Sequence, residues 1–315
     1  MTTLADLAEL VRAPAALSVP GDVIAGAAAA GALSPRTPAL AGASVLLYWA
    51  GMAANDWADR RLDAVERPER PIPSGRVTPA AAVGLAAGLT AAGVGLAAAV
   101  GGRRAAALAV PLAATIWGYD LLAKNTAAGP AVMAACRGLD VLLGASGGRL
   151  TRALPAAATV AAHTWTVTAL SRREVTGADA ALPKRTLAGT ALVAASAAVA
   201  VPGAKRARAV DQAGVTDSAG TVDEVGGRAR RTAGIAAVLP AVLAGWYAAR
   251  YGAAQVEVVR DPSAGRVRAA VGAGITGLPA LQGALTARGG AGLLGVAVAA
   301  AAPLGRRLAR KVSPT

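Results

Sequence analysis

The chain has 315 residues, of which 55% are hydrophobic and 16% charged, and its formal net charge is +14. Soluble domains usually carry about 25% charged residues, so this composition argues against an ordinary soluble protein. The Lys and Arg residues stand in short segments between apolar runs, which favours membrane topology and anionic lipid over nucleic-acid binding. Cys136 is the one cysteine, so an intrachain disulfide is excluded.

Long apolar runs recur along the chain, and a membrane-spanning helix needs roughly 20 mostly apolar residues. The runs predict helices at 14–34, 38–55, 78–101, 104–120, 126–147, 153–171, 185–202, 231–250, 266–287 and 290–308. Alanine and glycine lower the hydrophobicity of several runs, and these small residues would suit close helix packing. We expect about nine spans, within a range of eight to ten. A soluble, alanine-rich helical protein is the alternative.

The expected fold is therefore all-α, a polytopic membrane bundle forming a single domain over residues 1–315. A polar segment at 203–231 is expected to be a mobile loop, because it has few apolar anchors. Alternation of the spans places loops 56–77, 121–125, 172–184 and 251–265 on one side. That side carries the larger share of Lys and Arg, which predicts that it faces the cytoplasm.

A carboxylate cluster follows the second predicted helix. Asp56, Asp59 and Asp63 are spaced i, i+3 and i+7, so on a helix they share one face. Converging carboxylates repel one another and need a countercharge. Mg²⁺ is the natural candidate, because it prefers oxygen ligands and joins carboxylates to substrate phosphates. The alternative is a solvated helix end in which Arg60 and Arg61 pair with the acids.

A proline-stiffened segment with three arginines comes next. Arg67, Arg70 and Arg76 lie among Pro68, Pro71 and Pro73 in residues 67–76, and the prolines exclude a helix interior. Guanidinium groups suit bidentate phosphate binding. Each arginine alone could equally be a positive-inside anchor.

The two segments together read Asn55-Asp56-x-x-Asp59-x-x-x-Asp63-x-x-x-Arg67-x-x-Arg70-Pro71-x-x-Ser74-Gly75-Arg76. This pattern closely resembles the first motif of UbiA-type polyprenyltransferases. Members of that family are intramembrane enzymes that move a prenyl chain from its diphosphate to an acceptor. More narrowly, the chain resembles the divergent bacterial branch of that family that includes EboC-type proteins. The resemblance implies Mg²⁺-dependent prenyl transfer in a bacterial cell membrane, with the motif loops facing the cytoplasm.

The resemblance also implies residue roles. Tyr119 and Lys124 are similar to a short Tyr…Lys element of the family, although an interfacial anchor pair would look the same. The implied catalytic residues are Asp56, Asp59, Lys124 and Tyr119. The implied metal ligands are Asp56, Asp59, Asp63, Glu174 and Asp179. The implied diphosphate-binding residues are Asn55, Arg67, Arg70, Arg76, Arg137, Arg172 and Arg173.

Arg137 and His163 interrupt apolar runs. An arginine within a membrane span must find a partner or a polar cavity. Arg137 therefore either pairs with Asp140, three residues on, or faces the site. His163 has no Cys or carboxylate at metal-ligand spacing, so we expect it to be a helix-packing residue, as we do for Cys136.

The chain departs from the family in the second motif, which usually carries aspartates spaced four apart. Asp179 stands at one position, Val175 at the other with Glu174 beside it, and Arg172 and Arg173 are additional. The arginines could neutralise a diphosphate directly in place of a second Mg²⁺. Alternatively, a noncatalytic relative would bind or deliver a polyprenyl or other lipophilic precursor. An unrelated transporter is disfavoured, because the carboxylates gather at loop edges instead of mid-membrane.

The expected partners are a prenyl diphosphate, an unidentified acceptor and membrane lipid, without nucleic acid.

Overall fold

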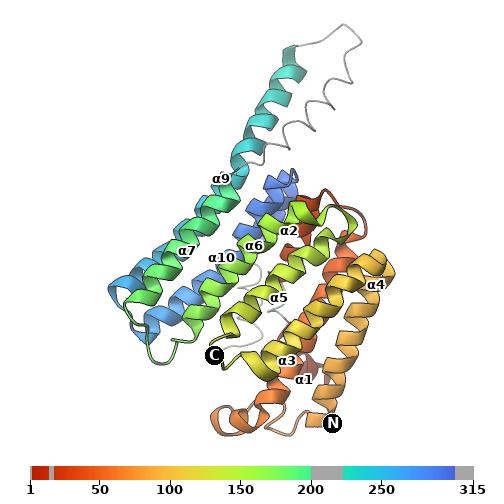
Figure 1. Ribbon diagram of the computed structural model, residues 1–315, viewed down its shortest axis with the longest axis vertical. Coiled ribbons are helices and arrows are strands. Elements are labelled where there is room, and N and C mark those ends of the chain that lie inside the picture. Colours follow the sequence, from red (N-terminus) through yellow and green to blue (C-terminus); the bar gives the residue numbers. More distant parts are fainter. Residues whose placement is uncertain (1, 14–17, 200–222, 302–315) are drawn as a thin grey trace.

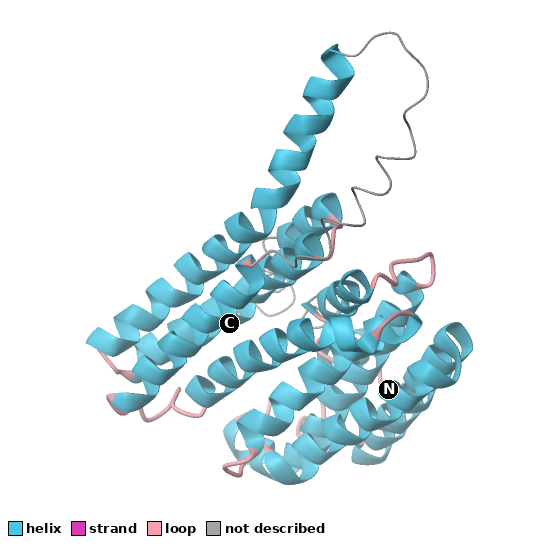
Figure 2. Ribbon diagram, turned by 45° about the horizontal axis from the view of Figure 1, so that its top comes forward, coloured by secondary structure: helices cyan, strands magenta, loops and turns pink. Residues whose placement is uncertain are grey.

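The computed structural model describes residues 2–13, 18–199 and 223–301. These residues are helical, without a strand, as Figures 1 and 2 show. The elements are α1 (Leu4–Leu10), α2 (Pro20–Ala30), α3 (Thr37–Glu66), α4 (Pro79–Gly118), η2 (Tyr119–Ala123), α5 (Gly129–Gly144), η3 (Ala145–Gly147), α6 (Leu150–Ser171), α7 (Ala181–Ala198), α9 (Asp223–Arg260), α10 (Ala264–Arg288) and a last helix at Gly292–Ala301. The predicted all-α fold is confirmed.

The backbone at Gly102 separates the two helices predicted at 78–101 and 104–120. Gly102 has φ 66° and ψ −160°, a conformation that glycine adopts at little cost. Figure 1 shows the two halves of α4 lying side by side after this reversal. The predicted boundary between the helices at 78–101 and 104–120 is therefore confirmed, although the helical hydrogen-bond pattern continues across the kink.

Several predicted boundaries were wrong. The helix predicted at 38–55 continues to Glu66, which puts all three aspartates of the cluster on α3. The predicted loop 203–231 is helical over 223–231, where α9 begins; residues 203–222 lie outside the described part. The predicted loop 251–265 is helical over 251–260, because Tyr251 and Val258 lie on the buried face that begins earlier in α9.

The end of the bundle that carries the carboxylate motif gathers three other connections. Lys124, which follows η2, pairs with Asp59 of α3, and Arg172 at the end of α6 donates to the carbonyl of Thr126. The α6–α7 and α9–α10 connections meet where Ala178 N donates to Pro262 O at 2.9 Å. The four loops predicted to share one side therefore share one end, at the bottom of Figure 1. Which side of a membrane this end faces stays a prediction.

Two of the described helical segments are long and apolar enough to cross a membrane by themselves, Thr37–Glu66 and Pro79–Ala123. Among the other described helices, α2 and α5 are too short, with 11 and 16 residues, and the longer ones are less apolar on average. The predicted number of spans therefore stays a prediction.

Glycines allow α2 and α5 to touch backbone to backbone. A methyl group on Gly26 would collide with the carbonyl oxygen of Val141, and one on Gly144 would collide with that of Val23. Small residues of this kind let membrane helices approach closely. The contact places Asp22, on α2, beside the inward face of α5.

Replacing Gly144 by Ala should destabilise the bundle by about 1–3 kcal/mol, the usual range for overpacking a core. The measurement is the thermal unfolding midpoint of the protein in detergent. Gly84→Ala is the matched control, because a methyl group there meets no atom within 4 Å. An equal loss of stability in both variants would contradict the close-contact explanation.

Candidate functional site

Two carboxylates of α3 converge on one guanidinium. Asp56 Oδ1 accepts hydrogen bonds from Arg12 Nη2 at 2.8 Å and from Arg70 Nη1 at 3.4 Å. Asp63 Oδ2 accepts from the same Arg70 nitrogen at 2.6 Å. Both aspartates are buried, with 4% and 3% of their surfaces exposed. The two acids are therefore neighbours around one positive centre, as their spacing on a helix predicts.

The third carboxylate faces the segment that follows α4. Asp59 Oδ1 lies 2.6 Å from Lys124 Nζ, and Asn55 Nδ2 donates to Asp120 Oδ1 at 3.0 Å. Both partners belong to the wide π-helical turn that begins at Tyr119 and closes with Lys124 N donating to Tyr119 O. Such turns are rare and often occur at functional sites. The structure thus brings the predicted Tyr…Lys element to the carboxylate motif. Asp120, which contacts Asn55, had no predicted role.

The three aspartates do not form one compact centre. Asp56 and Asp63 share Arg70, whereas Asp59 turns to Lys124. Within the described ranges, no group of three or more His, Cys, Asp or Glu side chains is placed to hold a metal ion. Cationic side chains supply the countercharge instead. The donor chemistry still fits a hard cation, because oxygens of Asp56 and Asp63 already converge on one positive atom. Their metal role stays a prediction.

The other predicted arginines of the first motif differ in their surroundings. Arg67 ends α3 and is exposed. Arg76 is bound by two acids of α1, Asp6 at 2.8 Å and Glu9 at 2.6 and 3.0 Å. Sequence reasoning missed Arg12, Asp6 and Glu9 as neighbours of the motif, because an isolated charge near the N-terminus carries no positional signal.

The second-motif residues separate into two groups. Arg172 Nη1 donates to the carbonyl of Thr126, two residues after Lys124, so Arg172 lies against the segment that carries Lys124. Arg173 is exposed. Of the two predicted diphosphate-binding arginines in this motif, the structure therefore brings Arg172 to the segment that carries Lys124.

The second-motif acids have other surroundings. Asp179 Oδ1 accepts from the backbone N–H groups of Leu182 and Ala181 at 2.8 and 2.9 Å, and these bonds hold the pKa of Asp179 below its ordinary value. Burial raises the pKa of Glu174, whose carbonyl accepts from Arg268. Across the described residues, no hydrogen bond or ion pair joins Glu174 or Asp179 to the first-motif acids. Their predicted metal role stays a prediction, and Asp179 visibly caps the first turn of α7.

Arg137 makes a pairing that the sequence did not predict. Its Nε lies 2.7 Å from Asp22 Oδ2, and its Nη2 donates to Ser18 O at 3.3 Å. Asp140, the predicted local partner, instead accepts from Ser44. Arg137 and Asp22 are both buried, so the pair ties α5 to α2 inside the bundle. The detectable signal was Asp22, the one charged residue of the apolar run 14–34, which needs a basic partner from another run.

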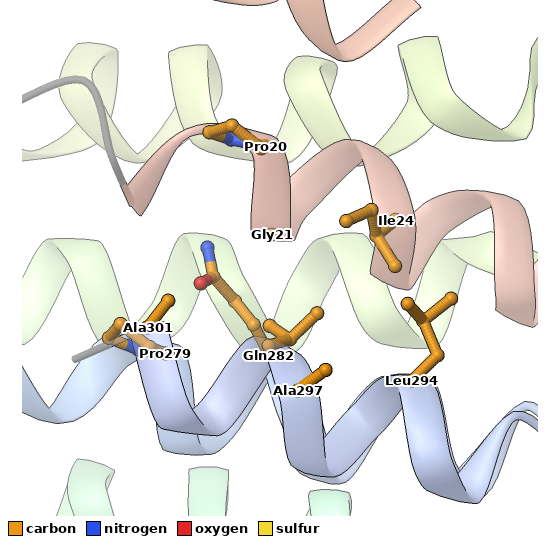
Figure 3. Close-up of a pocket in the computed structure, with 9 residues that line it drawn as sticks. Pro20, Gly21, Ile24, Pro279, Gln282, Leu294, Ala297 and Ala301 are labelled. Carbon is orange, nitrogen blue, oxygen red and sulfur yellow. The ribbon is translucent and has the colours of Figure 1, made fainter. Parts of the chain in front are cut away.

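Gln282 of α10 completes this polar group and lines an adjacent pocket. Its Nε2 donates to Asp22 Oδ1 at 2.6 Å and to Ser18 O at 2.7 Å. The pocket has a volume of about 250 Å³ and is otherwise lined by apolar and glycine residues of α2, α10 and the helix at 292–301. Figure 3 shows Gln282 reaching from α10 towards Gly21. The pocket is therefore an apolar space with one polar wall.

His163 is a packing residue, as predicted. Its Nδ1 lies 2.8 Å from Tyr247 Oη, and its ring packs edge-on against Tyr247 and Tyr251. Cys136 is likewise buried in an apolar cluster.

Comparison with known proteins agrees with this architecture. The model of the UbiA prenyltransferase family matches residues 18–215. Digeranylgeranylglyceryl phosphate synthase of Methanothrix thermoacetophila is 44% identical over 80 residues, which are 24% of this chain and 30% of that protein. The same enzyme of Natronomonas pharaonis is 44% identical over 85 residues, 26% of this chain and 31% of that protein. The chain thus matches about 30% of the length of these curated relatives.

Solved structures share the fold over nearly the whole chain. One described as digeranylgeranylglyceryl phosphate synthase has a TM-score of 0.63 at 14% identity and covers 91% of this chain and 98% of its own. A UbiA homolog from Aeropyrum pernix K1 has a TM-score of 0.56 at 19% identity and covers 89% and 96%. Placement in a divergent, EboC-like bacterial branch stays a prediction. Because the family model spans well over half of the chain and the architecture agrees, this integral membrane protein belongs to the UbiA prenyltransferase family.

Proposed function

We propose that this protein transfers a prenyl group from an isoprenoid diphosphate to an acceptor within the membrane. The observation that carries the proposal is the paired cluster at one end of the bundle, where Arg70 joins Asp56 and Asp63 and Lys124 joins Asp59. Membership of the UbiA family and local identity to digeranylgeranylglyceryl phosphate synthases support it. The relatives' acceptor suggests including a glyceryl phosphate lipid among the acceptors tested.

The basic side chains are placed to receive an anionic leaving group. A prenyl diphosphate is a stable ester until the charge on its diphosphate is neutralised. Arg70, Lys124 and Arg172 would donate charge-assisted hydrogen bonds to its oxygens, and this stabilisation grows as the C1–O bond breaks. The acceptor then bonds to C1 of the allylic cation and loses a proton.

The carboxylates have a complementary role. Asp56 and Asp63 would hold Mg²⁺, with Asp59 beside them, and the bound ion would supply Lewis-acid polarisation of diphosphate oxygens. Once an anionic substrate draws Arg70 and Lys124 towards itself, these carboxylates lose their present countercharge. Binding of the substrate and of the cation would therefore favour each other.

The apolar pocket beside Gln282 offers space for hydrocarbon. Its walls come from α2, α10 and the helix at 292–301, so a prenyl tail there would lie between helices.

Lys124→Met tests the proposed leaving-group contact. We expect the KM for labelled geranylgeranyl diphosphate to rise by about 10-fold or more in proteoliposomes, because a charge-assisted hydrogen bond is lost. Lys184→Met is the matched control, since Lys184 is exposed at the start of α7. The assay measures product and released diphosphate with and without Mg²⁺, over a panel of acceptors. Saturable binding without turnover over the whole panel would contradict transfer and favour a noncatalytic carrier.

A further inference from the structure

All five N–H donors of Arg76 are hydrogen-bonded to neighbouring residues, including two acids of α1. A guanidinium has five N–H donors. In Arg76, Nη1 donates to Asp6 and Glu9, Nη2 donates to Glu9 and to the carbonyl of Glu69, and Nε donates to Ser74. No donor of Arg76 is left for a diphosphate while α1 stays in this position.

The segment after α1 makes a second contact with the site. Arg12 donates to Asp56, and its backbone has φ 47°, a left-handed conformation that side chains with a Cβ rarely adopt. Leu10 and Val11 are buried against Ile72 and neighbouring apolar side chains, which holds the segment in place despite the strained backbone. α1 therefore contacts the arginine loop, and the segment that follows α1 contacts the carboxylate Asp56.

The charged contacts of α1 are open to competition. The Arg76 and Glu9 side chains are 37% and 46% exposed, and exposed ion pairs are weak. Asp6 is fixed to its own helix by a capping box with Thr3. Those hydrogen bonds, together with Arg76, lower the pKa of Asp6 to about 2, so its charge persists at neutral pH.

We propose that α1 is an N-terminal clamp whose carboxylates hold Arg76 in the substrate-free protein and release it when a diphosphate binds. The clamp rests on the proposed function, and it adds Arg76, which the family resemblance implies to be a diphosphate-binding residue, to the basic side chains that receive the diphosphate. Diphosphate replaces Asp6 and Glu9 as the acceptor of the guanidinium, and α1 then loses its principal electrostatic contact. The device keeps a strongly basic loop neutralised until an anionic substrate arrives.

The test uses inorganic diphosphate with Mg²⁺ and the full chain in detergent. Glu9→Gln should bind diphosphate about two- to fivefold more tightly than wild type, the range expected for removing one exposed ion pair. Glu66→Gln is the matched control, because it removes the same charge from an exposed position at the same end of the bundle. Hydrogen exchange of the Leu4–Leu10 amides in wild type should rise when diphosphate is added.

The possible outcomes separate the clamp from the proposed function. Wild-type binding with unchanged exchange in α1, or an equal gain in Glu9→Gln and Glu66→Gln, overturns the clamp and leaves the diphosphate site intact. Diphosphate binding by Glu9→Gln without detectable binding by wild type supports the clamp, because it shows that Glu9 blocks the site in the wild-type protein. No binding by wild type or by Glu9→Gln overturns both the clamp and the diphosphate site.

Discussion

Asp56→Asn is expected to lower prenyl transfer by at least about 100-fold, a loss typical of removing one electrostatic group from a preorganised site. The amide keeps the shape of the side chain but cannot neutralise Arg12 and Arg70 or bind a divalent cation strongly. The fold should persist, because Arg70 keeps its 2.6 Å contact with Asp63 and the Arg12 side chain is 40% exposed and can turn to water.

The measurement is kcat/KM for labelled prenyl diphosphate in proteoliposomes, with circular dichroism to monitor folding. Asp261→Asn provides a control that removes the same charge at an exposed position in the α9–α10 connection. Undiminished transfer by a folded Asp56→Asn protein would remove Asp56 from the proposed mechanism.

Local spacing was sufficient to predict which acids of α3 face one way, but not what neutralises each of them. Asp56, Asp59 and Asp63 follow helical periodicity, so a single face could be inferred from the sequence. Their partners come from elsewhere in the chain, such as Arg12, 44 residues before Asp56, and Lys124 in the turn after α4. The packing of α1 and η2 near α3 brings Arg12 to Asp56 and Lys124 to Asp59, while the loop after α3 folds back so that Asp56 and Asp63 share Arg70.

The ends of the helices could likewise not be predicted from the sequence. The first charged residue after an apolar run was taken to mark the end of a helix, yet α3 and α9 continue past such residues. α3 continues because its polar face meets basic partners, and α9 continues because Tyr251 and Val258 pack inside. The bundle class could be predicted from composition and run length, whereas helix ends depend on tertiary partners that a sequence does not reveal.

Arg137→Met should destabilise the protein by about 3–5 kcal/mol, the usual cost of removing one partner from a buried ion pair. The change leaves Asp22 and the nearby Asp140 buried without the guanidinium, and both have 0% exposed surface. Asp22→Asn should cost less, because the amide oxygen can still accept from Gln282 and Asp140 remains near Arg137. Thermal and denaturant unfolding in detergent measure both effects.

The double variant Asp22→Asn/Arg137→Met decides between two roles for Arg137. If the pair is structural, removing both charges should recover much of the stability lost in Arg137→Met, and transfer should recover with it. If Arg137 instead binds diphosphate, the double variant should regain stability but stay inactive. The 2.7 Å contact with Asp22 and the hydrogen bond to Ser18 favour the first result. A double variant as unstable as Arg137→Met would show that the energetic coupling lies with Asp140 or Tyr48, over whose ring the guanidinium lies.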